Sequence, residues 1–559
     1  MALTEVLEII SLELDSNLLL GFSIDLPERE RKNESYTISF GGWVVGRNSR
    51  AVRIEVLSEL AQIRMEPAWE SWSLQNIPVM VDRPDLAAIY PHLQSAENCG
   101  FWTTIGVIGL PPRFELALEA ILEDGTRVPI GSVRGQHLPI RTPFNVSTQP
   151  LLVTSLGRTG TTWLMHLLSY HKAVTTYKAY PYEVKMASYW LQVLRVLSQP
   201  ADYERSTGYS DFTDSLSWVG HNPFFAPPLT DSLALRNWFG SDQVATLASF
   251  CQQNIDSFYS QLGDKNSSGE PRYFAEKSNP DFVPWLMAEL YPQGKEIILV
   301  RDFRDMACSI LSFNAKRNSA GFHRDETETT ANYIHKLRIY ALHLLTSWKA
   351  RKASSLLVRY EDLICEPEKA LTRIHEYLGV ENSDASQTLI DATASSLEFR
   401  SHVTSGNPDQ SIGRWMNELD EEMKLACAEA FNDCLQEFGY EVDEYYLAVH
   451  SVVAANVPTG ADVLMVSRGD SRLLQLGARK TRHFPLDDSG EWLGYHPSED
   501  WLNSHLVKLQ EKGSEYLVIP EAAFWWFDYY EKFFSSLEAD HQRIVSTDCC
   551  VIFKLLNHS

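Results

Sequence analysis

Two short stretches carry residues whose types and spacing can hold a charged group. The first, LVTSLGRTGTTWLMHLLSYH at 152–171, joins a strand-like apolar run to an apolar helical pattern. Between them, Gly157 and Gly160 allow a tight turn with converging backbone N–H groups. Thr161 and Thr162 then open the helix and add hydroxyl donors and the positive end of its dipole. The stretch therefore predicts a loop that cradles an oxyanion.

This loop differs from the one that binds nucleoside triphosphates. Such a loop would place glycine at 162 and lysine at 163, where this chain has threonine and tryptophan. Because glycine-rich turns alone are weak evidence, an ordinary strand–helix turn is the alternative if the loop stands alone.

The second stretch, IILVRDFRDMACSILSF at 297–313, adds independent evidence for an anion site. Arg301 ends a second apolar strand, and Ser309 lies inside the helix that follows. An arginine and a serine so placed can both reach one phosphate. The alternative is a surface arginine beside a helix capped by Asp302 or Asp305.

Together, the two stretches resemble the two signatures of the sulfotransferase family, which uses 3'-phosphoadenosine-5'-phosphosulfate (PAPS). The resemblance covers the 149–448 region, and three further segments agree with it: FAEKSNP at 274–280, RYEDL at 359–363 and IGRW at 412–415. Since no membrane anchor is predicted, the chain is most similar to bacterial cytosolic members.

The resemblance assigns the co-substrate to named residues. The 5'-phosphosulfate motif of the family matches Gly157, Arg158, Thr159, Gly160, Thr161, Thr162 and Trp163. The 3'-phosphate is expected on Arg301 and Ser309, with Arg414 as an extra phosphate ligand. For Trp163, stacking on the adenine and a place in the core are both open.

Sulfuryl transfer by in-line attack needs positive charge beside the bridging oxygen, because the leaving phosphate gains negative charge. The resemblance puts Arg158 there. Because arginine does not give up its proton at neutral pH, we assign it electrostatic stabilisation. Lys277 either lies near the same oxygen or pairs with Glu276.

The acceptor needs a general base, and Glu183 is the first candidate. Desolvation among aromatic neighbours would raise the pKa of this carboxyl and suit it to the role. The neighbours are Tyr180, Tyr182 and Trp190. An ion pair of Glu183 with Lys185 or Arg158 is the alternative reading, and His221 is the alternative base.

The composition of the chain limits the classes of partner that it is expected to bind. The chain has 559 residues, 44% of them hydrophobic, and a formal net charge of -24. Such an acidic chain is not expected to bind nucleic acid or anionic membranes. Its N-terminus lacks the basic residues of a signal peptide, which predicts a cytoplasmic protein with reduced cysteines.

No metal site is predicted. The cysteines lack zinc-like spacing. In the C-terminal region His483 and His496 stand near Asp487 and Asp488, which we interpret as a solvated loop.

The pattern of strands and helices expected along the chain predicts an α/β protein with three domains. Residues 1–148 show alternating short strands, expected to form an antiparallel β-sandwich accessory domain. Residues 149–448 alternate strands and helices, which indicates a P-loop-like three-layer core with a parallel sheet. Residues 456–559 predict a small α/β accessory domain.

The sequence thus favours a PAPS-dependent sulfotransferase acting on a hydroxyl or amine of a carbohydrate or glycan precursor. A P-loop kinase is the second hypothesis, weakened by the missing lysine. A non-catalytic carbohydrate-binding protein is the third. The identity of the acceptor and the oligomeric state stay open at this point.

Overall fold

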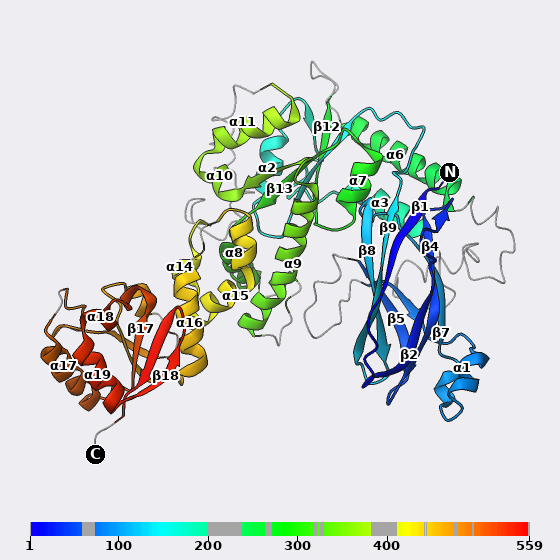
Figure 1. Ribbon diagram of the computed structural model, residues 1–559. Coiled ribbons are helices and arrows are strands. Elements are labelled where there is room, and N and C mark those ends of the chain that lie inside the picture. Colours follow the sequence, from blue (N-terminus) through cyan, green and yellow to red (C-terminus); the bar gives the residue numbers. More distant parts are fainter. Residues whose placement is uncertain are drawn as a thin grey trace. The chain divides into compact units, whose positions relative to one another are not determined.

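The computed structural model divides the chain into two compact units (Figure 1). One unit comprises Met1–Arg301 and Leu342–Val403, and the other comprises Asp302–Ala341 and Thr404–Ser559. The structure describes residues 2–58, 73–198, 238, 240–262, 271–317, 321–322, 324, 329–381, 411–440, 442, 444–474, 476, 479–494 and 497–556.

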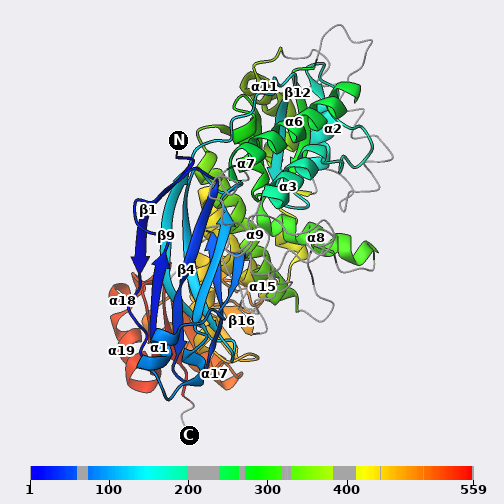
Figure 2. The same cartoon turned by 90° about the vertical axis from the view of Figure 1, so that its right-hand side faces the viewer.

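The N-terminal region is an antiparallel β-sandwich, as predicted. A six-stranded sheet in the order β3-β1-β9-β8-β5-β6 faces a three-stranded sheet in the order β2-β4-β7. The strands of the larger sheet are β1 (Thr4–Ser11), β3 (Lys32–Asn33), β5 (Ala51–Ser58), β6 (Ser73–Pro78), β8 (Arg113–Leu122) and β9 (Arg127–His137). Those of the smaller sheet are β2 (Leu19–Leu26), β4 (Thr37–Gly46) and β7 (Gly100–Gly106). Strand β8 shows why they form, because its alternate side chains are buried in the core. Figure 2 shows these long strands from the side, and the short helix α1 (Pro84–Ile89) follows β6.

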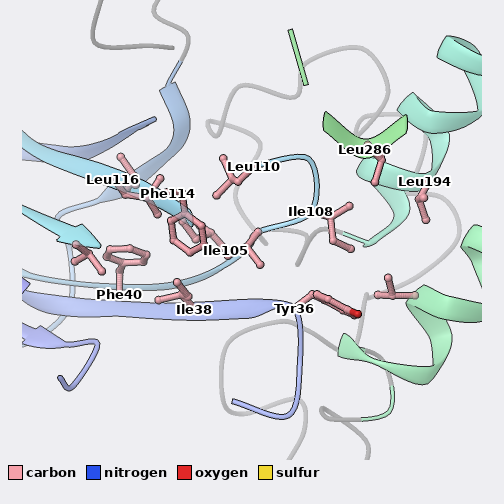
Figure 3. Close-up of a cluster of buried hydrophobic side chains, with 14 of the residues drawn as sticks. Tyr36, Ile38, Phe40, Ile105, Ile108, Leu110, Phe114, Leu116, Leu194 and Leu286 are labelled. Carbon is pink, nitrogen blue, oxygen red and sulfur yellow. The ribbon is translucent and has the colours of Figure 1, made fainter. Parts of the chain in front are cut away.

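The core of the sandwich continues into the helices of the neighbouring α/β layer. Ile108 and Leu110, which follow β7, belong to the same buried cluster as Leu194 of α3 (Met186–Ser198) and Leu286 of α7 (Val283–Leu290) (Figure 3). One apolar core therefore runs across residue 148. The domain boundaries at 148 and 448 stay predictions.

A buried carboxyl lies at this junction. Glu289 of α7 has one oxygen 3.5 Å from Nε2 of His137, at the end of β9. Burial raises the pKa of Glu289 to about 8. Its carboxyl therefore carries a proton at neutral pH, which lowers the cost of keeping it in this interface.

The second region is built on a parallel sheet, as predicted. Its strands lie in the order β11-β12-β10-β13-β14, and every pairing is parallel. The strands are β10 (Gln149–Ser155), β11 (Val174–Thr175), β12 (Tyr273–Ser278), β13 (Lys295–Val300) and β14 (Ser355–Arg359).

Helices cover both faces of this sheet because successive strand residues point to opposite sides. Leu151 and Val153 pack with α2 (Thr161–Leu168), α10 (Tyr360–Cys365) and α11 (Pro367–Leu378). Leu152 instead packs with α3, α6 (Asp242–Leu262) and α7. Figure 1 shows the two groups of helices on either side of β12 and β13.

The second unit holds helices and a further sheet. Its helices include α8 (Phe303–Arg317), the first part of α9 (Thr330–Arg351), α14 (Trp415–Glu418), α15 (Glu421–Glu437) and α16 (Glu444–Asn456). Helix α9 runs across the boundary between the units. Among the helices that the structure describes, none is both long and apolar enough to cross a membrane.

The C-terminal region is a mixed α/β layer, as expected. Its sheet has the order β16-β15-β17-β19-β18, in which β16, β15 and β17 are parallel and the last two strands are antiparallel. The strands are β15 (Asp462–Met465), β16 (Lys480–His483), β17 (Tyr516–Pro520), β18 (Gln542–Ser546) and β19 (Cys550–Lys554). One face packs on α16, and the other packs on α17 (Glu499–Glu511), α18 (Trp526–Tyr529) and α19 (Glu531–Asp540).

Candidate functional site

The predicted anion loop lies between β10 and α2. Gly160 has φ +89°, and a Cβ there would stand 2.3 Å from the ring of Tyr360. Both facts require glycine at this position. Thr159 is fully buried, and its hydroxyl donates to the carbonyl of Leu156 at 2.8 Å. Its side chain therefore closes the loop from inside, whereas Thr161 and Thr162 are partly exposed at the start of α2.

Arg301 fixes the backbone of this loop. Its Nη1 donates to the carbonyl of Arg158 at 3.0 Å, and its guanidinium lies 4.7 Å from the ring centre of Tyr360. The side chain is only 4% exposed, so the surface-arginine alternative is wrong. Tyr360 thus contacts both Gly160 and Arg301, which ties the end of β14 to the ends of β10 and β13. Arg158 itself adopts a left-handed φ of +66°, a strained conformation for a residue with a Cβ.

Lys277, near the end of β12, connects this loop to the segment that carries Glu183. Its Nζ donates to Thr162 Oγ1 at 3.0 Å, to the carbonyl of Pro181 at 2.7 Å and to Glu183 Oε1 at 2.6 Å. Burial lowers the pKa of Lys277, and Glu183 opposes this effect. The alternative of a pairing with Glu276 is wrong, because adjacent strand residues point to opposite faces of the sheet.

Glu276 occupies the other face and holds the start of α3. Its carboxylate accepts from the backbone N–H of Ala187 at 2.6 Å and of Ser188 at 3.3 Å. The hydroxyl of Tyr259 also donates to it. Burial raises the pKa of Glu276, and these donors act against that rise. Two consecutive residues of β12 therefore grip residues 181–188 from two sides.

Glu183 lies in a different environment from the expected one. Its side chain is 57% exposed rather than desolvated. It forms an ion pair with Lys277, not with Lys185 or Arg158. The alternative base, His221, lies outside the described residues.

A contact that the sequence analysis did not predict supports the same segment. Tyr182 is 6% exposed and has a left-handed φ of +66°. Its hydroxyl shares a 2.8 Å hydrogen bond with Nδ1 of His166 in α2. Tyr182, the residue before Glu183, is thus held against α2, the helix that follows the anion loop. No local signal in the sequence pairs these two side chains.

Trp163 belongs to the core. It is 4% exposed and packs with the buried side chains of α2 and the sheet. The structure favours this alternative over stacking on an adenine, because the ring presents almost no surface to a ligand.

In the second unit, the second motif organises the segment at 413–415. Asp302 accepts from the N–H of Arg304 at 2.9 Å, so the predicted cap of α8 is present. The carboxylate of Asp305 accepts from the N–H groups of Gly413 at 2.7 Å and of Trp415 at 3.0 Å. Arg304 stacks over Trp415 at 4.2 Å.

Ser309 and Arg414 are both buried in this unit, at 2% and 6% exposure. The guanidinium of Arg414 donates to both oxygens of Glu418, at 2.8 and 2.6 Å, and to Ser312 Oγ at 3.0 Å. These bonds fix the guanidinium through Nε and Nη2.

His483 of the C-terminal region does not lie in the expected solvated loop. His483 is the last residue of β16 and is 5% exposed, so its interpretation as a solvated side chain is wrong. His496 lies outside the described residues. No cluster of metal-ligating side chains occurs in the part of the chain that the structure describes.

Comparison with known proteins identifies the region that carries the loop. Residues 150–384 match the model of the sulfotransferase family. No curated protein matches the chain.

Solved structures of sulfotransferases are similar to this chain at low identity. The sulfotransferase domain of the Synechococcus PCC 7002 olefin synthase is 17% identical, covering 55% of this chain and 100% of its own, with a TM-score of 0.32. The sulfotransferase domain from the curacin biosynthetic pathway is 13% identical, covering 54% and 100%, with a TM-score of 0.29. Mouse sulfotransferase SULT7A1 complexed with PAP is 15% identical, covering 52% and 86%, with a TM-score of 0.29. At these values the likenesses add nothing to the family match.

Proposed function

We propose that this chain, whose residues 150–384 belong to the sulfotransferase family, moves a sulfuryl group from PAPS to a hydroxyl or amine of a carbohydrate or glycan precursor. One observation carries the proposal. Lys277 joins Thr162 of the anion loop to Glu183, the candidate base, through hydrogen bonds of 3.0 and 2.6 Å. A phosphosulfate held by the loop and an acceptor hydroxyl or amine activated by Glu183 would then both lie beside Lys277.

The 5'-phosphosulfate would bind at the loop of residues 157–162. Backbone N–H groups of the turn, the start of α2 and the Thr161 and Thr162 hydroxyls supply donors for its oxygens. The 3'-phosphate is assigned to Arg301 and Ser309 by resemblance. Because the Thr159 hydroxyl donates to Leu156 and Arg414 donates to Glu418 and Ser312, we give both residues supporting roles.

Two cations would stabilise the leaving phosphate. Arg158 keeps its proton and acts by charge alone. Lys277, whose pKa burial lowers, is the better proton donor to the bridging oxygen. Its three hydrogen bonds hold the ammonium beside the loop, and donation to the bridging oxygen would replace one of them, to Thr162, Pro181 or Glu183.

Glu183 would accept the proton of the attacking group. The new bond forms between the acceptor oxygen or nitrogen and sulfur, while the bond from sulfur to the bridging oxygen breaks. The products are the sulfated acceptor and 3'-phosphoadenosine 5'-phosphate (PAP). The exposure of Glu183 leaves it open to an incoming acceptor, whose arrival would exclude water from the carboxylate.

Aromatic side chains that follow Glu183 in the chain support a sugar as the acceptor. Tyr189 of α3 is 59% exposed and lies edge-on to Trp190, with ring centres 5.4 Å apart. Exposed rings with a polar tip suit ligands that combine apolar C–H faces with hydroxyls. These residues follow Glu183 closely in the chain.

The test is transfer of labelled sulfate from PAPS to a panel of glycans, with lipids and phenols as comparison acceptors. We expect transfer to a glycan, with kcat falling about 10²–10⁴-fold in Glu183→Gln. The matched control is Glu381→Gln, because Glu381 is also an exposed carboxylate paired with a lysine. Absence of transfer to every acceptor, together with Mg²⁺-dependent ATP turnover, would instead support the kinase hypothesis.

A further inference from the structure

The C-terminal sheet has the geometry of a second ligand-binding edge. Strand β15 lies between β16 and β17, and all three are parallel. The chain leaves β15 toward one neighbour and later returns on its other side. In open α/β sheets, ligands bind outside the carboxyl ends of the strands at such a reversal of strand order. A ligand-binding site is therefore expected at the residues that follow β15 and β17.

A buried polar pair lies at this edge. Ser467, just after β15, and His483, the last residue of β16, share a hydrogen bond of 2.5 Å between Oγ and Nδ1. They are only 3% and 5% exposed. The Ser467 oxygen also accepts from the N–H of Gly469 at 3.4 Å. The pair thus fixes the start of the loop after β15 to the end of the neighbouring strand.

This loop presents an arginine in a strained conformation. Arg468 has a left-handed φ of +53° and an exposed side chain. Its Nη1 donates to the carbonyl of Ala522, after β17, at 3.1 Å. Among the described residues this is the only hydrogen-bond partner of the guanidinium, so its other N–H groups are available to a ligand. Strain of this kind persists where surrounding contacts hold it, often at ligand clamps.

Aromatic rings flank the arginine. The guanidinium of Arg468 lies 5.8 Å from the ring centre of Trp525, and Trp525 lies 5.6 Å from Tyr529, which is 63% exposed. Trp492 packs so closely against the next residue, Gly469, that a Cβ on this glycine would stand 2.8 Å from the indole. The loop after β15 therefore contacts Trp525 through Arg468 and Trp492 through Gly469.

We propose that residues 467–469, His483, Trp492 and Trp525 form a carbohydrate-binding site, separate from the sulfuryl-transfer site. A partly exposed indole offers a flat apolar face to the C–H groups of a pyranose ring. The guanidinium offers several donors to ring and hydroxyl oxygens. Sites with aromatic walls and a few placed polar groups are typical of small ligands. The site does not depend on the proposed acceptor, because it would bind a sugar without PAPS.

The experiment titrates the full chain, without nucleotide, with the methyl glycosides of glucose, galactose, N-acetylglucosamine and glucuronic acid. Saturation-transfer NMR and calorimetry would report binding. We expect at least one glycoside to bind with a millimolar or lower Kd, following the affinity expected of a small ligand. Trp525→Ala and Arg468→Ala should each weaken it at least about tenfold, a change of about 1.4 kcal/mol.

Control variants show whether the indole face itself binds the sugar. Trp525→Phe keeps an aromatic face and should retain most of the binding, which tests stacking in a variant with little change in packing. Glu183→Gln should also leave binding intact, since it alters only the proposed transfer site. Binding that survives Trp525→Ala, or that disappears in Glu183→Gln, would overturn the proposal, as would failure of all four glycosides to bind.

Discussion

The edge of the parallel sheet at β10, β12 and β13 differs from the C-terminal edge at β15, β16 and β17 in how its polar groups are held. At the first, Lys277 and Arg301 are buried cations that donate to the loop and to its neighbours. At the second, the buried groups are the hydrogen-bonded side chains of Ser467 and His483, and the cation, Arg468, is exposed.

Each arrangement suits a different task. Buried cations fixed by several hydrogen bonds are arranged to stabilise charge that develops during a reaction. An exposed arginine beside aromatic rings suits recognition, because it can form and release contacts with a neutral or charged ligand. We therefore assign chemistry to the first edge and binding to the second.

Lys277→Met should have the largest effect. It removes the ammonium that joins Thr162, Pro181 and Glu183 while keeping an unbranched side chain. We expect kcat for sulfate transfer to fall about 10²–10³-fold, as for loss of one charge-stabilising donor. Lys172→Met is the control, because Lys172 is 66% exposed and pairs with an exposed glutamate. Transfer that stays within about tenfold of the parent chain would exclude Lys277 from the reaction.

The Gly160→Ala substitution should have the next largest effect. The new Cβ would meet the Tyr360 ring at 2.3 Å in a left-handed conformation. Gly125→Ala has the same kind of φ, +86°, but its Cβ would meet nothing within 4 Å. Chemical denaturation should therefore show Gly160→Ala losing about 1–3 kcal/mol more than Gly125→Ala. PAP binding should weaken in the first variant and not in the second. Equal losses would mean that Tyr360 can move aside.

His483 gives the C-terminal edge a pH dependence. Burial lowers its pKa below the ordinary value of 6.5, so the unfolded chain binds the proton more tightly than the folded one. The contribution of His483 to the free energy of unfolding should be constant above about pH 6.5 and fall as the pH drops below it. His483→Gln should lessen this fall, measured by urea denaturation with tryptophan fluorescence. A fall of the same size in the variant would assign it to other groups.

Arg468→Ala should have the smallest effect on transfer. If the two edges act independently, kcat and KM for sulfate transfer from PAPS to a short acceptor should stay within about twofold. A loss of about tenfold would instead mean that the two edges form one functional site. Steady-state assays with purified full chain decide between these outcomes.

The first edge was predictable because its motif residues stand directly after apolar strands. Gly160, Thr161 and Thr162 sit between a strand and a helix, and Arg301 follows a later apolar strand. The parallel sheet followed from the same alternation. The direction in which each side chain points is harder to predict from neighbouring residues alone. Glu276 and Lys277 point to opposite faces, so Lys277 pairs with Glu183 instead.

The second edge was not predictable in the same way. Ser467, His483 and Trp525 come from separate segments that only strand pairing brings together. The acidic residues after His483 favour a solvated side chain, whereas the pairing of β16 with β15 buries it. Local pattern gives no information on such long-range contacts. A polar residue at or just beyond the end of two parallel strands, as for Ser467 and His483, is the signal that could have located this pair.

Calorimetric titration of the full chain with PAP tests most directly whether the first edge holds the co-substrate. We expect binding with micromolar or better affinity, and loss of this binding in Arg301→Ala. Arg301 orders the loop through the Arg158 carbonyl and is assigned to the 3'-phosphate, so its removal acts twice on the same ligand. Undetectable PAP binding by the unaltered chain, or unchanged affinity in Arg301→Ala, would contradict the proposed function.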